Sequence, residues 1–135
     1  MLLDRIEQEL PGGSLLCPLD AIFRKLDAIA EMARKRHQSK AGCIIGNLST
    51  ELSGTHEAFR VRLAECFEEM AQEFVPHLEV AVRGRRIKPS AQELARYIVT
   101  VIEGAIMQSR TRRDVMVLDV QFGALKEHLK KMLNS

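Results

Sequence analysis

The sequence predicts an all-α protein of about six helices. Three observations predict this class. Apolar residues recur at intervals of three and four along most of the chain, the alternation of a half-buried strand is missing, and aromatic residues, which sheets favour, make up only 4%. A length of 135 residues is enough to close one hydrophobic core. We therefore expect residues 1–135 to form a single helical domain.

Proline and glycine divide the first half of the chain into three helical segments. The first, residues 2–10, ends at a Pro-Gly-Gly-Ser run that cannot continue a helix. Pro18 suits the first turn of the second helix, because the first N–H groups of a helix have no partner within it. Arg36 lies at the end of this helix, where a cation meets the negative end of the dipole. A third, short helix ends at residues 53–54.

Three longer helices are predicted in the second half. Thr55 can cap the first of them, whose apolar stripe continues to about residue 82. Gly84 then follows, a residue that readily takes the left-handed conformation after a helix. Ser90 begins a Ser-x-x-Glu capping box, which is the strongest boundary signal in the sequence. Asp114 is a suitable cap for the last helix.

Composition argues against several functional classes. The formal net charge is only +2, too small for a protein that relies on many phosphate contacts. The three cysteines lie far apart without a Cys-x-x-Cys pair, and the four histidines show no metal-ligand spacing. No carboxylate pair, nucleophile–base set or phosphate loop stands out. We therefore expect no enzyme, no cofactor and no metal site.

The same features point to the cytoplasm. The chain has no signal-peptide pattern at its start, and no apolar stretch long enough to span a bilayer. Cysteines without a pairing pattern are typical of reduced thiols. We expect a cytoplasmic protein that does not contact a membrane.

The last two helices predict self-association. The helix that follows Ser90 is apolar around most of its circumference, and the last helix carries a second apolar stripe. Two such surfaces exceed what a chain of this size needs, so we expect both helices to pair with their copies in a homodimeric four-helix bundle. The predicted interface residues are Ile98, Val101, Gly104, Ala105, Leu118, Phe122, Leu125 and Leu129. The alternative is that the first of these helices is central within one chain.

Two segments resemble a known family. Gly42-Cys43-x-x-Gly46-Asn47-Leu48-x-x-Glu51-Leu52 resembles the short helix in the ligand-binding domain of TetR-type (tetracycline-repressor-like) transcriptional regulators. Gly84-Arg85-Arg86-Ile87-Lys88-Pro89, followed by Leu94-Ala95 and Ile102-Glu103-Gly104-Ala105, resembles that family's connection into its dimerisation helices. The resemblance extends over essentially the whole chain in order and spacing.

This resemblance implies a C-terminal regulatory domain that dimerises and binds a small, largely apolar effector. Regulators of this type begin with a helix-turn-helix domain, and nothing in the sequence matches that domain. Residues 1–10 would be the end of the helix that joins the two domains. We therefore expect DNA binding only in a longer parent protein, through an N-terminal domain absent here.

The resemblance also implies an effector pocket among the middle helices. Phe and Met side chains would form its adaptable apolar wall, and amides would orient the ligand. The matching positions are Phe23, Asn47, Phe67, Met70, Phe74, Ile102 and Gln108. For the apolar positions the alternative is ordinary core packing, and for the amides it is hydrogen bonding to nearby backbone. For the protein as a whole the alternative is a structural helical homodimer without a ligand.

Cys43 offers a third interpretation of the function. It lies at the expected start of the short helix, where N–H groups and the positive end of the dipole lower the pKa of a thiol. Such a thiol could sense electrophiles or oxidants, although a cysteine there can also be small apolar filler. Glu103 lies in a narrow polar strip with Arg96 and Arg110, which favours an ion pair, within one subunit or between subunits, over a general acid.

Overall fold

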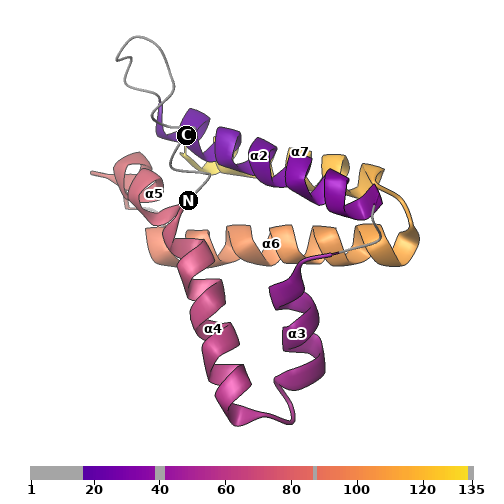
Figure 1. The fold of residues 1–135 in the computed structure, drawn as a ribbon. Helices are drawn as coiled ribbons and strands as arrows, with labels where there is room; N and C mark the ends of the chain where they lie inside the picture. The colour runs from indigo at the N-terminus through magenta and orange to yellow at the C-terminus, as the bar shows by residue number, and fades with distance from the viewer. Residues whose placement is uncertain (1–16, 39–41, 87, 134–135) are drawn as a thin grey trace.

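The computed structural model describes residues 17–38, 42–86 and 88–133. Within these residues it has six helices and no strand, which confirms the all-α class. The helices are α2 (Pro18–Gln38), α3 (Ile44–Leu52), α4 (Glu57–Gln72), α5 (Val75–Val82), α6 (Ala91–Arg112) and α7 (Met116–Leu133) (Figure 1). The segment predicted over residues 2–10, as the end of an interdomain helix, lies outside the described residues.

Helix α6 lies at the centre of the fold. In Figure 1 it runs across the molecule, with α2 and α7 on one side and with α3 and α4 extending from the other. It packs against α7, α4, α5 and α2, and Leu94, Ile98 and Ile102 are fully buried there. Helix α6, which is apolar around most of its circumference, is thus covered on two sides within one chain. This agrees with the alternative to a dimer contact, in which the helix is central within one chain.

Several predicted helix boundaries are confirmed. Ser90 and Glu93 form the capping box at the start of α6: the Glu93 N–H donates to Ser90 Oγ at 3.3 Å, and the Ser90 N–H donates to Glu93 Oε2 at 2.7 Å. Asp114 Oδ1 accepts the Met116 N–H at 3.0 Å and so caps α7. Gly84 follows α5 with a φ of 73°, in the left-handed region.

The long helix predicted from Thr55 to about residue 82 is wrong in two places. The structure ends α4 at Gln72 and begins α5 at Val75. Pro76 lies in the first turn of α5, where its missing N–H is harmless, but it could not lie inside a continuous helix. The N-cap of α4 is His56, and the Thr55 hydroxyl contacts the His56 ring instead of capping the helix.

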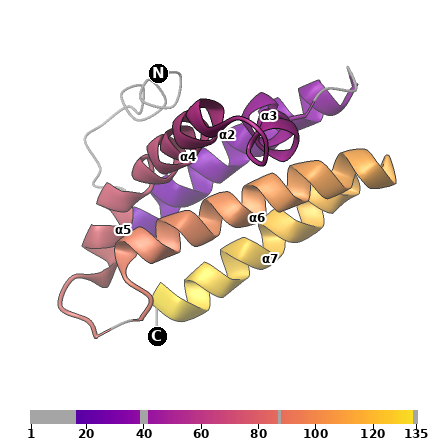
Figure 2. The same ribbon diagram turned by 90° about the horizontal axis from the view of Figure 1, so that it is seen from below.

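Most of the predicted interface residues lie in the core of a single chain. The stripe on α7 packs against α6 and α2, and none of these side chains is more than 4% exposed. The buried residues are Ile98, Ala105, Leu118, Phe122, Leu125 and Leu129. Val101 and Gly104 are half-buried. On these two helices, only the outer sides therefore remain accessible to a partner chain. The two helices run side by side, with α7 at the edge of the molecule (Figure 2).

Candidate functional site

A cavity of about 300 Å³ lies where four segments converge. The second half of α2, the start of α3, the end of α4 and the middle of α6 each supply part of its wall. Its volume is at the lower end of the range for small-molecule sites. The apolar residues that line it are Ile29, Met32, Ala33, Ile44, Ile45, Met70, Phe74, Val99, Ile102 and Ile106.

Helical spacing explains how the longer helices contribute. On α6 the lining residues Val99, Glu103 and Ile106 follow each other at intervals of four and three, so they share one face. On α2, Ile29 and Arg36 lie seven residues apart on one face in the same way. Helix α3 meets these faces with its first turn only.

Glu103 is the unusual residue in this largely apolar wall. Its Oε1 atom is buried and has no hydrogen-bond partner among the described residues. Its Oε2 atom approaches the first turn of α3 so closely that a Cβ built on Gly46 would lie 2.5 Å away. Glycine at position 46 is therefore what lets the carboxylate come this close to α3.

Burial raises the pKa of Glu103 above its ordinary value, and a hydrogen bond from the Cys43 thiol offsets part of this rise. Among the described residues of one chain, Glu103 does not form the expected ion pair with Arg96 or Arg110, and an ion pair between subunits stays a prediction. Arg96 Nε instead donates to Glu68 Oε1 at 2.7 Å, and Arg110 Nη1 donates to Asn47 Oδ1 at 3.2 Å. Arg96 lies on the side of α6 that faces α4, where Glu68 is within its reach.

The surroundings of Cys43 differ from those that its position in the sequence predicted. Cys43 is the N-cap of α3 and lines the cavity, as its position in the sequence predicted. However, burial raises its pKa, and so does the adjacent Glu103 carboxylate, against the opposing effect of the Gly46 and Ile45 N–H groups. Since the thiolate is the reactive form, a raised pKa works against activation of this thiol.

The structure brings three of the seven predicted ligand residues together. Met70, Phe74 and Ile102 line the cavity. Phe67, on α4, is half-buried against the core and is not among the residues that line the cavity. Phe23 lies elsewhere on α2, under the ammonium groups of two lysines of α7, each 5.7 Å from its ring centre.

The two predicted amides lie on the surface. Asn47 is exposed and accepts the hydrogen bond from Arg110 described above. Gln108 is exposed and accepts a hydrogen bond from Arg112 Nε at 3.3 Å. The sequence interpretation instead missed Ile29, Arg36 and Glu103 as lining residues. The three-and-four periodicity of α2 and the charge of Glu103 inside an apolar helix were the signals that could have found them.

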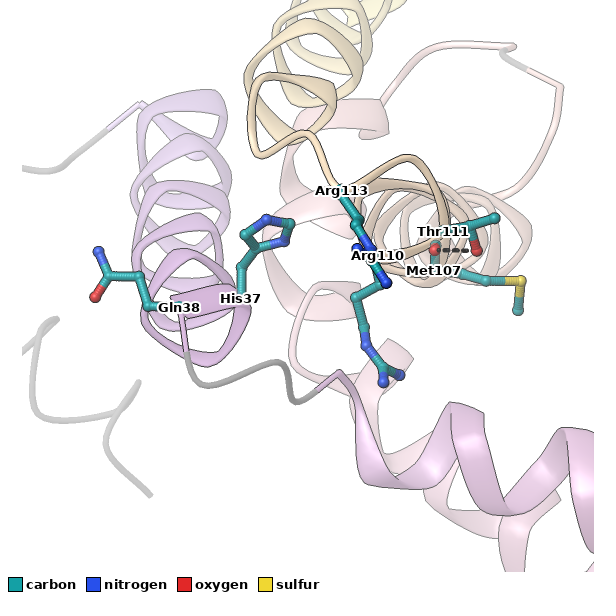
Figure 3. Close-up of a pocket in the computed structure, with 6 residues that line it drawn as sticks. All are labelled: His37, Gln38, Met107, Arg110, Thr111 and Arg113. Atoms are coloured by element: carbon teal, nitrogen blue, oxygen red, sulfur yellow. Dashed lines mark hydrogen bonds between the residues drawn. The ribbon is translucent and has the colours of Figure 1, made fainter.

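A second cavity, of about 550 Å³, lies at the C-terminal ends of α2 and α6. It is lined by His37, Gln38, Met107, Arg110, Thr111 and Arg113. Figure 3 shows His37 directed toward the α6 residues, Gln38 directed away from them, and the Arg110 side chain extending toward the start of α3. Its basic residues lie near helix C-termini, where they complement the dipole.

Two properties of the described residues bear on function. No group of three or more His, Cys, Asp or Glu residues in residues 17–38, 42–86 and 88–133 is arranged to hold a metal ion. None of the six helices combines the length and the apolar character that crossing a bilayer requires.

The chain is similar to known regulatory proteins. The model of a family described as "Transcriptional regulator LmrA/YxaF-like, C-terminal domain" matches residues 18–121. An uncharacterized HTH-type transcriptional regulator in the lacX 3' region of Lactococcus lactis subsp. lactis is 31% identical over 91 residues, which cover 67% of this chain and 45% of that protein. The chain thus matches less than half the length of this relative. No solved structure matches it.

Proposed function

The chain belongs to the LmrA/YxaF-like family of TetR-type C-terminal regulatory domains, and on that premise we propose that it binds a small, largely apolar effector and dimerises. The observation that carries the first part is the cavity of about 300 Å³, whose wall comes from four different segments. A ligand held there would contact α2, α3, α4 and α6 at once, so it could bias how these helices are arranged.

In a longer parent protein, that bias would act on DNA binding. The homodimer would set the separation of two DNA-reading domains, and an effector between the helices would change it. This chain alone, with a net charge of +2 and helices committed to the core, would contribute no sequence-specific DNA contact.

Thermal denaturation tests the effector site. Small apolar compounds that bind only the folded state should raise the melting temperature, by mass action. Ile106→Phe would occupy part of the cavity and should reduce these shifts. Val120→Phe, on the exposed surface of α7, serves as the control that leaves them unchanged. A broad library without any shift would favour the structural homodimer instead.

The proposed dimer contact is the outer α6–α7 face, which consists of Tyr97, Val101, Gly104, Val117, Ala124 and His128. On each helix these positions recur at intervals of three, four or seven, so they share one side of the helix, which borders the buried stripe. The Tyr97 and His128 rings contact each other, with centres 5.8 Å apart, so the two helices present one continuous surface. A Cβ at Gly104 would meet nothing within 4 Å, so a second helix could approach there closely.

Two glycines provide a matched test of this contact. Gly104 lies on the outer α6–α7 face, whereas Gly123 lies on another side of α7, and a Cβ at either would meet nothing within 4 Å. Lysine at either position should therefore leave the fold intact. Light scattering should show a dimer for the wild type and for Gly123→Lys, and a monomer for Gly104→Lys. A wild-type monomer at micromolar concentration would refute the dimer.

A further inference from the structure

We infer that the effector carries an ammonium group on an apolar body, and that Glu103 Oε1 binds this group. The inference rests on the proposed effector-binding function of the cavity and specifies the chemical class of its ligand. It is drawn from the position of one carboxylate and from what its neighbours already bind.

The first step is the orphaned oxygen. Glu103 lines the cavity, and its Oε1 atom is buried without a hydrogen-bond partner among the described residues. Burying a polar atom without a partner is costly, and more so when the group is charged. A buried acceptor at the wall of an apolar cavity therefore marks the place where a donor is missing.

The second step is that the cations near the cavity are directed to other acceptors. Arg36 Nη1 donates to the Gly42 carbonyl at 3.1 Å. Arg110 Nη1 donates to Asn47 Oδ1 at 3.2 Å. Lys25 Nζ lies 3.8 Å from a carboxylate oxygen of Glu73, the second acidic residue of the wall. None of the ion pairs between described residues includes Glu103.

The third step is that the carboxylate is held in place by α3. The Cys43 side chain, at the N-cap of α3, lies beside it, and Gly46 leaves room for Oε2 beside the first turn. This leaves Oε1 as the acceptor for a ligand. Since the wall is otherwise mainly apolar, the rest of the ligand must be apolar. An ammonium group matches the remaining site best, because it supplies hydrogen-bond donors and a compensating charge together.

Three probes with the same tail test the inference on the full 135-residue chain: n-octylamine, n-octanol and octanoate. Calorimetric titration should show n-octylamine binding about ten-fold or more tightly than n-octanol, the difference expected for a hydrogen bond to a charged group. Octanoate should bind most weakly. Equal binding of amine and alcohol would overturn the inference but leave the effector site standing. If octanoate bound most tightly, the inference would be wrong, and Arg36 would be the residue that binds the charged group of the ligand. No binding of any probe would overturn the proposed function and, with it, the inference.

Variants of the two wall carboxylates assign the effect to one residue. Glu103→Gln keeps the shape of the side chain and should abolish the preference for n-octylamine over n-octanol. Glu73→Gln is the matched control and should retain the preference, because Glu73 is already paired with Lys25. A retained preference in Glu103→Gln, or its loss in Glu73→Gln alone, would overturn the assignment.

Gly46→Ala offers an independent test that leaves Glu103 unchanged. Its Cβ would lie 2.5 Å from Oε2, so the carboxylate must move away from α3. We expect a reduced preference for n-octylamine over n-octanol, with melting still cooperative. An unchanged preference would show that the position of the carboxylate against α3 does not matter, and would overturn the third step.

Discussion

The two ends of the molecule use their apolar residues differently. Where α2, α5 and α7 cover α6, the core is closed, and Ile22, Leu78 and Leu129 have no exposed surface. Two ion pairs between α2 and α7, Arg34 with Asp119 and Lys126 with Asp27, lie at its rim. Where α3 and α4 extend from the other side of α6, α3 buries no residue fully, and the cavity lies near its first turn.

The two ends should therefore differ in how readily they change conformation. A closed core gives a single well-ordered arrangement, whereas an element with few buried contacts opens at lower free energy. The cavity has walls of both kinds, because α6 belongs to the closed core and α3 does not. A ligand there could therefore move the α3 side of its site against a fixed α6 side.

The largest expected difference between the two ends concerns the loss of a leucine. Leu129→Ala removes a fully buried side chain from α7 and should lower the free energy of unfolding by about 3 kcal/mol. Leu48→Ala removes a half-buried side chain from α3 and should lower it by about 1 kcal/mol. Urea denaturation followed by circular dichroism measures both. Equal losses would contradict the comparison.

Helix caps at the two ends should differ by a smaller amount. Ser90 caps α6, so Ser90→Ala should lower the free energy of unfolding by about 1 kcal/mol. Thr55 precedes α4 without capping it, so Thr55→Ala should change this free energy by less than about 0.5 kcal/mol. If Thr55→Ala lowers the melting temperature more than Ser90→Ala does, the assignment of Ser90 as a cap and of Thr55 as a residue without a capping role is wrong.

The smallest expected effect is a change in the pH dependence of stability. The pKa of Glu103 is raised by burial, so the folded state binds its proton more tightly than the unfolded state does. Stability from this residue is therefore greatest at acid pH and falls as pH rises from the ordinary carboxyl range through the raised pKa. Glu103→Gln should remove this fall, which urea titrations at several pH values would show.

The other charged and titratable groups around Glu103 are the same in the wild type and in Glu103→Gln, so a difference between their pH profiles is due to Glu103. Cys43 contacts it from α3, while Arg36 and Glu73 line the same cavity from α2 and the end of α4. All three remain in the Glu103→Gln variant. A parallel pH profile for the two proteins would mean that Glu103 has an ordinary pKa in the folded state.

The helical class and most helix boundaries could be predicted from the sequence, because these depend on local physics. A capping box at Ser90, a carboxylate cap at Asp114 and a left-handed glycine at Gly84 each act within a few residues. The break between α4 and α5 was missed because the apolar stripe continues across it. Pro76 was the local signal, and the stripe outweighed it in the interpretation.

Which apolar residues face the core, the cavity or solvent could not be predicted in this way, because it depends on tertiary packing. Met70, Phe74 and Ile102 were predicted for the pocket and line it, but Phe23 belongs to the contact between α2 and α7. The stripe on α7 was predicted to bind a second chain and instead packs against α6 and α2. Periodicity shows that a helix has an apolar face, but the partner of that face depends on how distant segments come together. The same reason hid Glu103 Oε1, the buried oxygen without a hydrogen-bond partner among the described residues, since such an absence depends on how distant segments pack.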